Sequence, residues 1–176
     1  MINIENTDID GVKIVSPIIH KDNRGYFLES YNHSNFKLAN SSILFVQDNE
    51  SSSRLGTLRG IHFQTGVHQQ SKLVRVVKGK IQEIAIDLRF DSPTYKKYIS
   101  IVLDDKNKKQ LFIPKGFGHA FLVLSDFSIV SYKVDEYYNQ EYESGIKYND
   151  PTLNIKWQLN DKDLIISDRD KNLPYL

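Results

Sequence analysis

Short runs of alternating apolar and polar residues dominate this sequence, and a period of two is typical of β-strands that bury one face. The stretch 72–90, KLVRVVKGKIQEIAIDLRF, alternates from Leu73 to Val77, turns at Lys78–Gly79 and then resumes. Further short runs, separated by Asp, Asn, Lys or Gly, occupy 98–104, 109–117, 119–125 and 128–134. Many short strands at this spacing predict an all-β sandwich or barrel.

Helical patterns are sparse. The segment 33–40 is compatible with one or two helical turns, 105–110 with a turn between strands, and 137–153 with turns and a short helix. We find no internal repeat, linker or low-complexity tract in the 176 residues. That length suits one domain with a sizeable core, so we predict a single domain over 1–176.

Composition narrows the function classes. The chain has 23 Lys and Arg against 22 Asp and Glu, and this balance argues against a nucleic-acid partner. The absence of cysteine rules out disulfides, a zinc–thiolate site and a cysteine nucleophile, and it fits a reducing compartment. The sequence contains no run of about 18 apolar residues, so we expect no transmembrane helix. The polar start MINIENTDID is not a signal peptide. We therefore expect a cytoplasmic protein that has no membrane partner.

Five histidines are the first candidates for chemistry. His62 and His119 are embedded in apolar, strand-like runs, whereas His20, His33 and His68 stand in polar contexts. A histidine in a strand is more often a hydrogen-bonded structural residue than a functional one. For His62, in the heptad LRGIHFQ, the open possibilities are a metal ligand, a core residue and a catalytic base.

Spacing adds a motif to these histidines. Pro114, Gly116 and His119 form the pattern P-x-G-x-x-H, which resembles the second motif of the cupin superfamily. The first cupin motif begins H-x-H, but here the second histidine is replaced by Gln64. A glutamine amide is a poor ligand for transition metals, and metal cupins need about three histidines and a glutamate. We therefore expect metal-free chemistry without a cofactor, ahead of a metal-dependent oxygenase.

Eight blocks in a fixed order give a more specific resemblance. Together they resemble the dTDP-4-dehydrorhamnose 3,5-epimerase family, which consists of metal-free cupins, over nearly the whole chain. The resemblance implies a jelly-roll barrel (a double-stranded β-helix) with a few short helices, a homodimer, and a nucleotide-linked 4-keto sugar as substrate. The blocks are residues 22–32, 45–51, 58–64, 72–81, 87–95, 111–125, 132–138 and 166–170.

The resemblance assigns a base to the reaction. A ketone acidifies the neighbouring C–H bonds, so an epimerase needs a base, a stabiliser for the enolate oxygen and an acid on the opposite face of the ring. His62 matches the family's base, and Asp170 matches the carboxylate that orients it, with Asp168 as the less favoured choice. The C-terminal tail would then fold back over the barrel. Without the resemblance, a polar tail is usually a solvated terminus.

Three further residues match the remaining needs of the reaction. Tyr132 matches the family's general acid, Lys72 the residue that faces the enolate, and His119 a second polar group near the keto oxygen. Read alone, Tyr132 is a packed strand tyrosine and Lys72 a solvated lysine at the start of a strand.

The remaining matches concern the nucleotide. Arg59 matches a phosphate ligand, and Arg169 stands where the family often has lysine. Gln47 and Asn49 match contacts to the nucleotide, and Tyr138 matches a contact to the thymine end.

Residues from the segment RGYFLE match those that the family contributes to the neighbouring subunit's site. They are Arg24, Phe27 and Glu29. In a monomer, the charged residues of this segment would form only a solvated strand face.

The leading hypothesis is 3,5-epimerisation of dTDP-4-keto-6-deoxyglucose to dTDP-4-keto-L-rhamnose, an isomerase reaction. One alternative is an enzyme that epimerises only C3 or only C5 of a related nucleotide 4-keto sugar. Another is a cupin that binds a nucleotide sugar without turnover, although His62, Tyr132 and Asp170 are all present. The role of Gln64 stays open.

Overall fold

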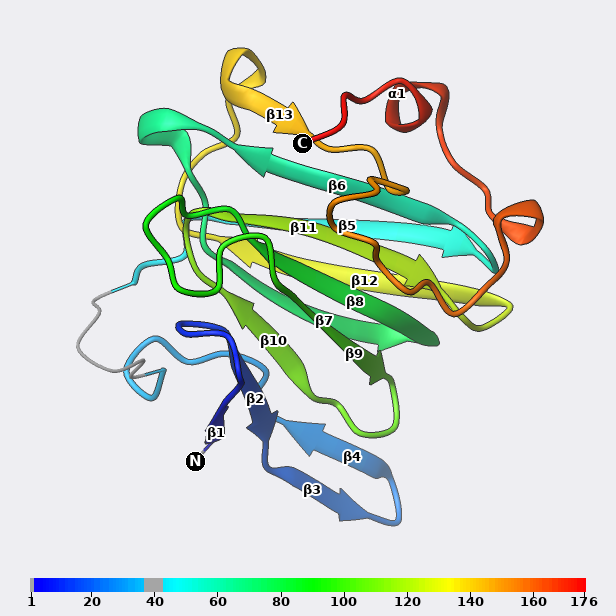
Figure 1. Cartoon of the computed structure of the whole chain (residues 1–176). Coiled ribbons are helices and arrows are strands. Elements are labelled where there is room, and N and C mark those ends of the chain that lie inside the picture. Colours follow the sequence, from blue (N-terminus) through cyan, green and yellow to red (C-terminus); the bar gives the residue numbers. More distant parts are fainter. Residues whose placement is uncertain (1, 37–42) are drawn as a thin grey trace.

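Two antiparallel β-sheets face each other in the computed structural model, which describes residues 2–36 and 43–176 (Figure 1). One sheet has six strands in the order β1-β2-β10-β7-β12-β5, and the other has five in the order β13-β6-β11-β8-β9. Strands distant in sequence alternate within each sheet, as in a jelly roll. The predicted all-β jelly roll is confirmed.

The strand bounds follow the alternating runs of the sequence closely. The six-stranded sheet contains β1 (Ile2–Asn6), β2 (Lys13–Pro17), β10 (Gln110–Ile113), β7 (Lys72–Lys78), β12 (Phe127–Val134) and β5 (Gln47–Arg54). The five-stranded sheet contains β13 (Glu143–Gly145), β6 (Leu58–Gln64), β11 (Phe117–Val123), β8 (Lys80–Asp87) and β9 (Tyr98–Asp104). A separate hairpin is formed by β3 (Ile19–Asp22) and β4 (Gly25–Leu28).

The main core lies between the two sheets. Its buried side chains include Val74 and Val76 of β7, Ile81 and Ala85 of β8, and Val130 of β12. These residues are two or four positions apart along their strands, because alternate side chains of a strand point to the same face. Burial of these aliphatic groups is the main favourable term in holding the sheets together.

The outer face of the five-stranded sheet is also covered. Ile84 and Ile86 of β8 point away from the main core and pack with Ile146, Leu153 and Ile155 from the segment after β13. Consequently β8 is buried on both faces along nearly its whole length, and its sequence shows little alternation.

Helical structure is limited to a few short pieces, as expected. The described part of 33–40 is a turn, and residues 37–40 lie outside the described residues. The short helix expected within 137–153 is the 3₁₀ turn Gln140–Tyr142, which β13 follows. The expected turn between strands at 105–110 is present between β9 and β10.

The other helical pieces are equally short. They are the 3₁₀ turns Gly66–His68 and Asp161–Asp163 and the helix α1 (Asp168–Lys171). No helix in the described part of the chain is long and apolar enough to span a membrane.

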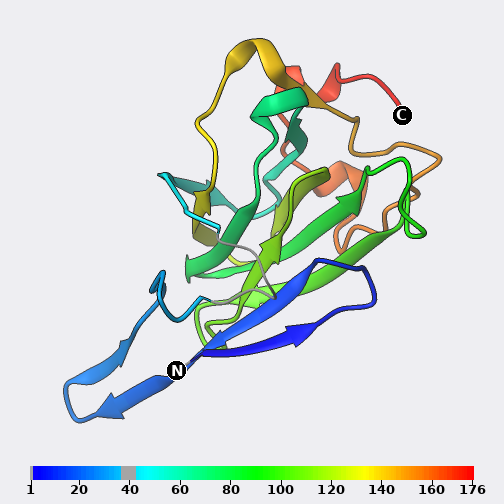
Figure 2. The same ribbon diagram turned by 90° about the vertical axis from the view of Figure 1, so that its left-hand side faces the viewer.

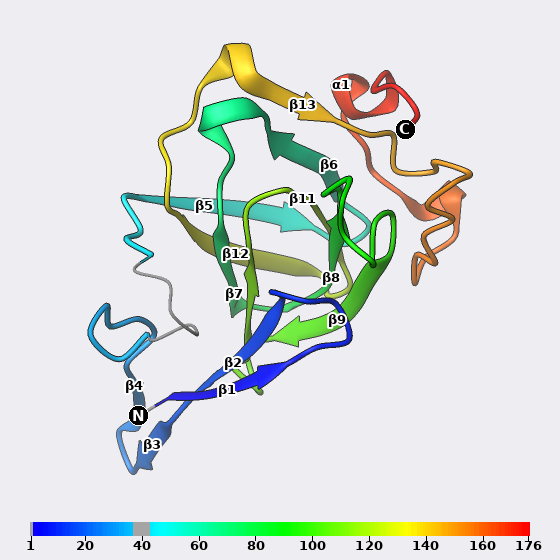
Figure 3. The ribbon, with the colours of Figure 1, turned by 60° about the vertical axis from the view of Figure 1, so that its left-hand side comes forward.

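The β3–β4 hairpin and the C-terminal segment lie at opposite ends of the molecule. Figures 2 and 3 show the hairpin extending beyond the sheets near the N-terminus, whereas α1 lies beside β13 and β6. Within residues 2–36 and 43–176, the two strands of the hairpin pair only with each other. Its aromatic side chains are exposed, with Phe27 70% and Tyr26 58% accessible.

We predict that Gly79→Ala destabilises the protein by about 3 kcal/mol, because φ is +86° at Gly79 and an added Cβ would clash with the carbonyl oxygen of Phe127. Gly66→Ala is the matched control, since φ is +58° there and the nearest atoms to the added Cβ, on the Tyr142 ring, lie at an ordinary contact distance of 3.5 Å. The free energy of unfolding should fall by only about 1 kcal/mol in this variant. Urea unfolding measures both, and equal losses would contradict the role of the clash.

Candidate active site

A cavity of about 660 Å³ opens between the two sheets on the side of the C-terminal segment. Its size is within the usual range for small-molecule sites. Polar side chains from both sheets and from residues 165–170 line it. It brings together ten of the thirteen residues singled out in the sequence, namely Gln47, Asn49, Arg59, His62, Lys72, His119, Tyr132, Tyr138, Arg169 and Asp170.

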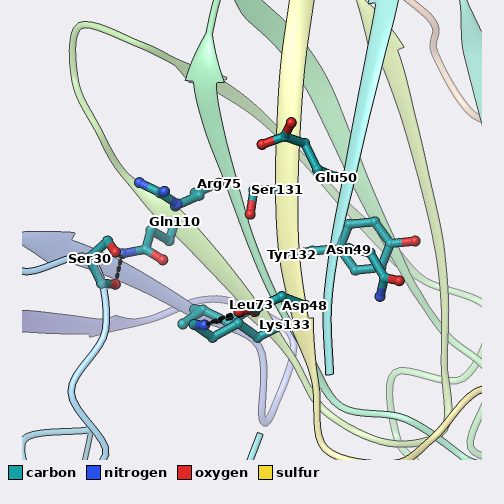
Figure 4. A pocket seen from close by; sticks show the side chains of 10 residues that line it. All are labelled: Ser30, Asp48, Asn49, Glu50, Leu73, Arg75, Gln110, Ser131, Tyr132 and Lys133. Atoms are coloured by element: carbon teal, nitrogen blue, oxygen red, sulfur yellow. Dashed lines mark hydrogen bonds and ion pairs between the residues drawn. The ribbon is translucent and has the colours of Figure 1, made fainter. Parts of the chain in front are cut away.

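A smaller hollow of about 350 Å³ lies on the outer face of the six-stranded sheet (Figure 4). Figure 4 shows Arg75 and Gln110 pointing to this outer side, whereas Tyr132 and Asn49 point across the sheet toward the larger cavity. The alternation of side chains along β12 and β5 therefore decides which residues serve the cavity.

His62 and Asp170 meet in the cavity although they are 108 residues apart. His62 Nε2 lies 2.8 Å from Asp170 Oδ1, and the backbone N–H of Gly60 donates to Asp170 Oδ2. Burial by itself would raise the pKa of Asp170, but these hydrogen bonds hold it below its usual value.

A helix cap holds Asp170 in this position. Ser167 is the N-cap of α1, and its side chain accepts a hydrogen bond from the backbone N–H of Asp170. Asp168, the less favoured choice in the sequence, points to solvent. The structure thus pairs His62 with Asp170.

Tyr132 lies on β12 of the six-stranded sheet, opposite the strand that carries His62. Its ring centroid is 6.0 Å from that of His119 and 5.8 Å from Lys72 Nζ. Burial raises the pKa of the Tyr132 phenol above its usual value. The hydroxyl therefore keeps its proton at neutral pH and is available as a donor.

Lys72 and His119 are both buried beside the cavity. Burial lowers the pKa of Lys72 to about 8, although the electrostatic effect of Glu83 and Glu143 acts to raise it. Burial lowers the pKa of His119 well below its usual value, and the charges of Lys72 and His62 act in the same direction. At neutral pH this part of the cavity therefore holds one ammonium group and one neutral imidazole.

Glu143 organises the outer rim of the cavity and was not singled out in the sequence. Its Oε2 accepts a 2.7 Å hydrogen bond from the hydroxyl of Tyr138 and lies 2.7 Å from Arg169. Glu143 sits in a turn-rich segment where a glutamate is unremarkable. Only the pairing of β13 with β6 brings it to the cavity.

The loop that carries Tyr138 is held by two glutamines. Gln64 accepts a 3.0 Å hydrogen bond from the backbone N–H of Asn139, and Gln47 accepts a 3.3 Å bond from the backbone N–H of Tyr138. Gln64 is buried at the end of β6. In place of a metal-binding histidine, Gln64 therefore anchors the loop at the cavity rim.

Arg24, Phe27 and Glu29 are not part of this cavity. Arg24 pairs with Asp22 in the exposed hairpin, and Glu29 accepts hydrogen bonds from the nearby Asn32 and Asn35. Among residues 2–36 and 43–176, no three His, Cys, Asp or Glu side chains converge as a set that could hold a metal ion.

The model of the dTDP-4-dehydrorhamnose 3,5-epimerase family matches residues 6–176. This chain belongs to that family. A dTDP-4-dehydrorhamnose 3,5-epimerase from Methanothermobacter thermautotrophicus is 48% identical over 94% of this chain and 90% of its own length.

Two solved structures of family members are also very similar. The enzyme from Bacillus anthracis, with TDP and PPi bound, is 41% identical with a TM-score of 0.95, over the whole of both chains. The 3,5-epimerase from Legionella pneumophila, in complex with dTDP-4-keto-L-rhamnose, is 41% identical with a TM-score of 0.95, over 99% of this chain and 93% of that one.

We predict that Gln64→Leu loosens the 138–139 loop without unfolding the barrel, because the N–H of Asn139 loses its acceptor. Hydrogen exchange should accelerate about tenfold at the amides of Tyr138 and Asn139. Gln69→Leu is the control, since no described hydrogen bond involves the Gln69 side chain. Unchanged exchange in Gln64→Leu would show that this bond does not hold the loop.

Proposed function

We propose that the protein epimerises dTDP-4-keto-6-deoxyglucose at C3 and C5 to give dTDP-4-keto-L-rhamnose. One observation carries the proposal: the His62–Asp170 pair stands on one sheet and the Tyr132 phenol on the facing sheet, with the cavity between them. A base and an acid on opposite sides of a bound ring are what inversion at carbon requires. The family's named activity and the bound product in the Legionella relative support the same reaction.

The first step of the mechanism is removal of a proton next to the ketone. His62 acts as the base, and the carboxylate of Asp170 orients its ring and stabilises the imidazolium that forms. Because Asp170 is buried and keeps its charge, this stabilisation acts with little screening by water.

The enolate oxygen then needs positive charge and hydrogen-bond donors. Lys72 supplies the charge, and His119 supplies a second polar group beside it. Donors that are fixed in a cavity before the reaction begins do not have to reorganise as charge develops, so they stabilise an oxyanion strongly.

Protonation from the opposite face completes each inversion. Tyr132 donates its phenolic proton to the carbon and regains one from solvent, and His62 releases to solvent the proton that it removed. The raised pKa of Tyr132 keeps the donor loaded across the neutral range. Repetition of the cycle at the second carbon gives the doubly inverted sugar, because both carbons adjoin the same ketone.

The rim residues bind the nucleotide. Arg59 and Arg169 bind the diphosphate, for which the guanidinium geometry is well suited. Gln47, Asn49 and Tyr138 contact the nucleoside. Arg169 and Tyr138 both contact Glu143, so this carboxylate holds two binding groups at the rim.

A homodimer completes the site in this proposal. The hairpin exposes Arg24 and Phe27 to solvent, far from the chain's own cavity, and its strands pair with no other strand of the described chain. Exposed aromatic groups on a projecting element are typical of a surface that docks elsewhere. Arg24, Phe27 and Glu29 would then reach the cavity of the neighbouring subunit.

The test of the reaction is incorporation of solvent deuterium into dTDP-4-keto-6-deoxyglucose, read at C3 and C5 separately by NMR. The wild-type protein should label both carbons, whereas Tyr132→Phe should bind dTDP normally and lose about 100-fold in product formation, since only the phenolic proton is removed. Labelling at C3 alone would indicate the one-carbon alternative. Binding without labelling at either carbon would favour the non-catalytic alternative.

The shared site can be tested with two inactive variants. We predict that His62→Asn and Arg24→Ala are each inactive alone, but that their co-expression restores about a quarter of wild-type activity. Half of the dimers then contain one of each subunit, and each of these has one site with both His62 and Arg24 intact. Absence of recovery from two well-folded parents would contradict a site shared between subunits.

A further inference from the structure

Glu83 is a fully buried carboxyl group that the mechanism above does not use. It lies on β8 between Ile81 and Ala85 of the same strand face, so its side chain points into the space between the sheets. Its Oε1 is 2.6 Å from Nε2 of His119, which lines the cavity. Glu83 thus stands directly behind a residue of the candidate active site.

A proton must lie between these two atoms. A carboxylate oxygen and an unprotonated ring nitrogen would repel each other at 2.6 Å, so either the carboxyl group or Nε2 carries hydrogen. With hydrogen on Nε2, the fixed ring N–H does not form an acceptable hydrogen bond to Oε1. A hydrogen on the carboxyl group, in contrast, can turn toward the nitrogen by rotation about the C–O bond. The geometry therefore favours Glu83 as the donor.

Other buried carboxylates in this protein show what an ionised group requires. Asp87 accepts hydrogen bonds from Arg89, Ser92 and Thr94, and Asp170 accepts them from His62 and Gly60. Neither oxygen of Glu83 has such a donor among the described residues. A buried carboxylate without donors is strongly disfavoured, whereas the neutral acid is tolerated.

The surroundings act in the same direction. Burial raises the pKa of Glu83 well above its usual value, opposed by the charge of Lys72, and burial lowers the pKa of His119. Neutral forms of both groups are therefore favoured. The other titratable groups that face this pair are Lys72 on β7, His62 on β6, Tyr132 on β12 and Glu143 on β13.

We propose that Glu83 is a positioning residue that, as a neutral acid, donates its proton to Nε2 of His119 and so fixes the tautomer of that imidazole. A neutral imidazole carries one hydrogen, so a ring that accepts at Nε2 must carry its hydrogen on Nδ1. Nε2 is the enclosed nitrogen of the ring, which leaves Nδ1–H as the donor for the cavity. On the proposed function, that N–H is a fixed donor for the enolate oxygen.

The tautomer can be observed directly, whether or not the protein turns over the sugar. Imidazole ¹⁵N shifts of the folded, ligand-free protein should show His119 with hydrogen on Nδ1, the signal being assigned with a His119→Gln variant. Glu83→Met should abolish that preference, while Glu83→Gln should keep it because an amide N–H also donates. Hydrogen on Nε2 in the wild type, or a doubly protonated ring, would overturn the proposal.

Kinetics give a second, independent readout. Glu83→Met should lose about 100-fold in kcat with little change in KM, since a donor to the oxyanion is misdirected. Glu83→Gln should stay within about fivefold of wild type and leave the basic limb of the pH profile in place, because the proposed acid is uncharged. If Glu83 instead acted as a counter-charge to Lys72, Glu83→Gln would move that limb to lower pH, and the proposal would fail.

A neighbouring residue controls for loss of packing. Gln82 is equally buried but points to the other side of β8, where it bonds to Ser100 and to the backbone of Lys156. Gln82→Met should lower the unfolding temperature without altering the tautomer of His119. Full activity and an unchanged tautomer in Glu83→Met would overturn the role of Glu83. Absence of sugar exchange in the wild type would overturn only the proposed function.

Discussion

The contact between His62 and Asp170 is the interaction on which the arrangement of the cavity depends. It joins the middle of a central strand to the last segment of the chain and brings a charged carboxylate into a buried position. The carboxylate is tolerated there because it also accepts from the backbone of Gly60. The polar C-terminal segment is thereby held against the barrel, and one wall of the cavity with it.

The candidate catalytic residues are divided between the two sheets. His62 and His119 stand on neighbouring strands of the five-stranded sheet, directly paired in register. Lys72 and Tyr132 stand on neighbouring strands of the other sheet. A jelly roll places such groups on facing walls at a fixed separation, since each strand alternates between the core and the outer surface. Pre-organised polar groups of this kind are also costly to bury, and the surrounding aliphatic core offsets that cost.

Much of the fold could be predicted from the alternating runs, because period-two patterns report directly on one-sided burial. The pairing of His62 with Asp170 could be predicted only from the family resemblance, since nothing local in the sequence links the two residues. Glu83 was missed although its spacing from Ile81 and Ala85 places it on the core face. The reason is that β8 is buried on both sides, so its sequence does not distinguish inward from outward positions.

The contacts at the cavity rim required the tertiary structure. Glu143 and Gln64 are ordinary polar residues in sequence, and only the pairing of β13 with β6 reveals their partners. The short helix expected within 137–153 is a single 3₁₀ turn, and β13 follows it directly. Short polar segments have little intrinsic preference, so the strand pairing available at the edge of the sheet decided their conformation.

The two glutamines that hold the 138–139 loop contact its backbone amides and not its side chains. Every residue except proline offers the same amide, so these two anchors of the loop do not depend on which side chain stands at position 138. Evolution can therefore exchange the group presented at position 138 while the loop keeps its place over the cavity. The rim is a point where ligand preference can diverge without any change to the barrel or to the residues deeper inside it.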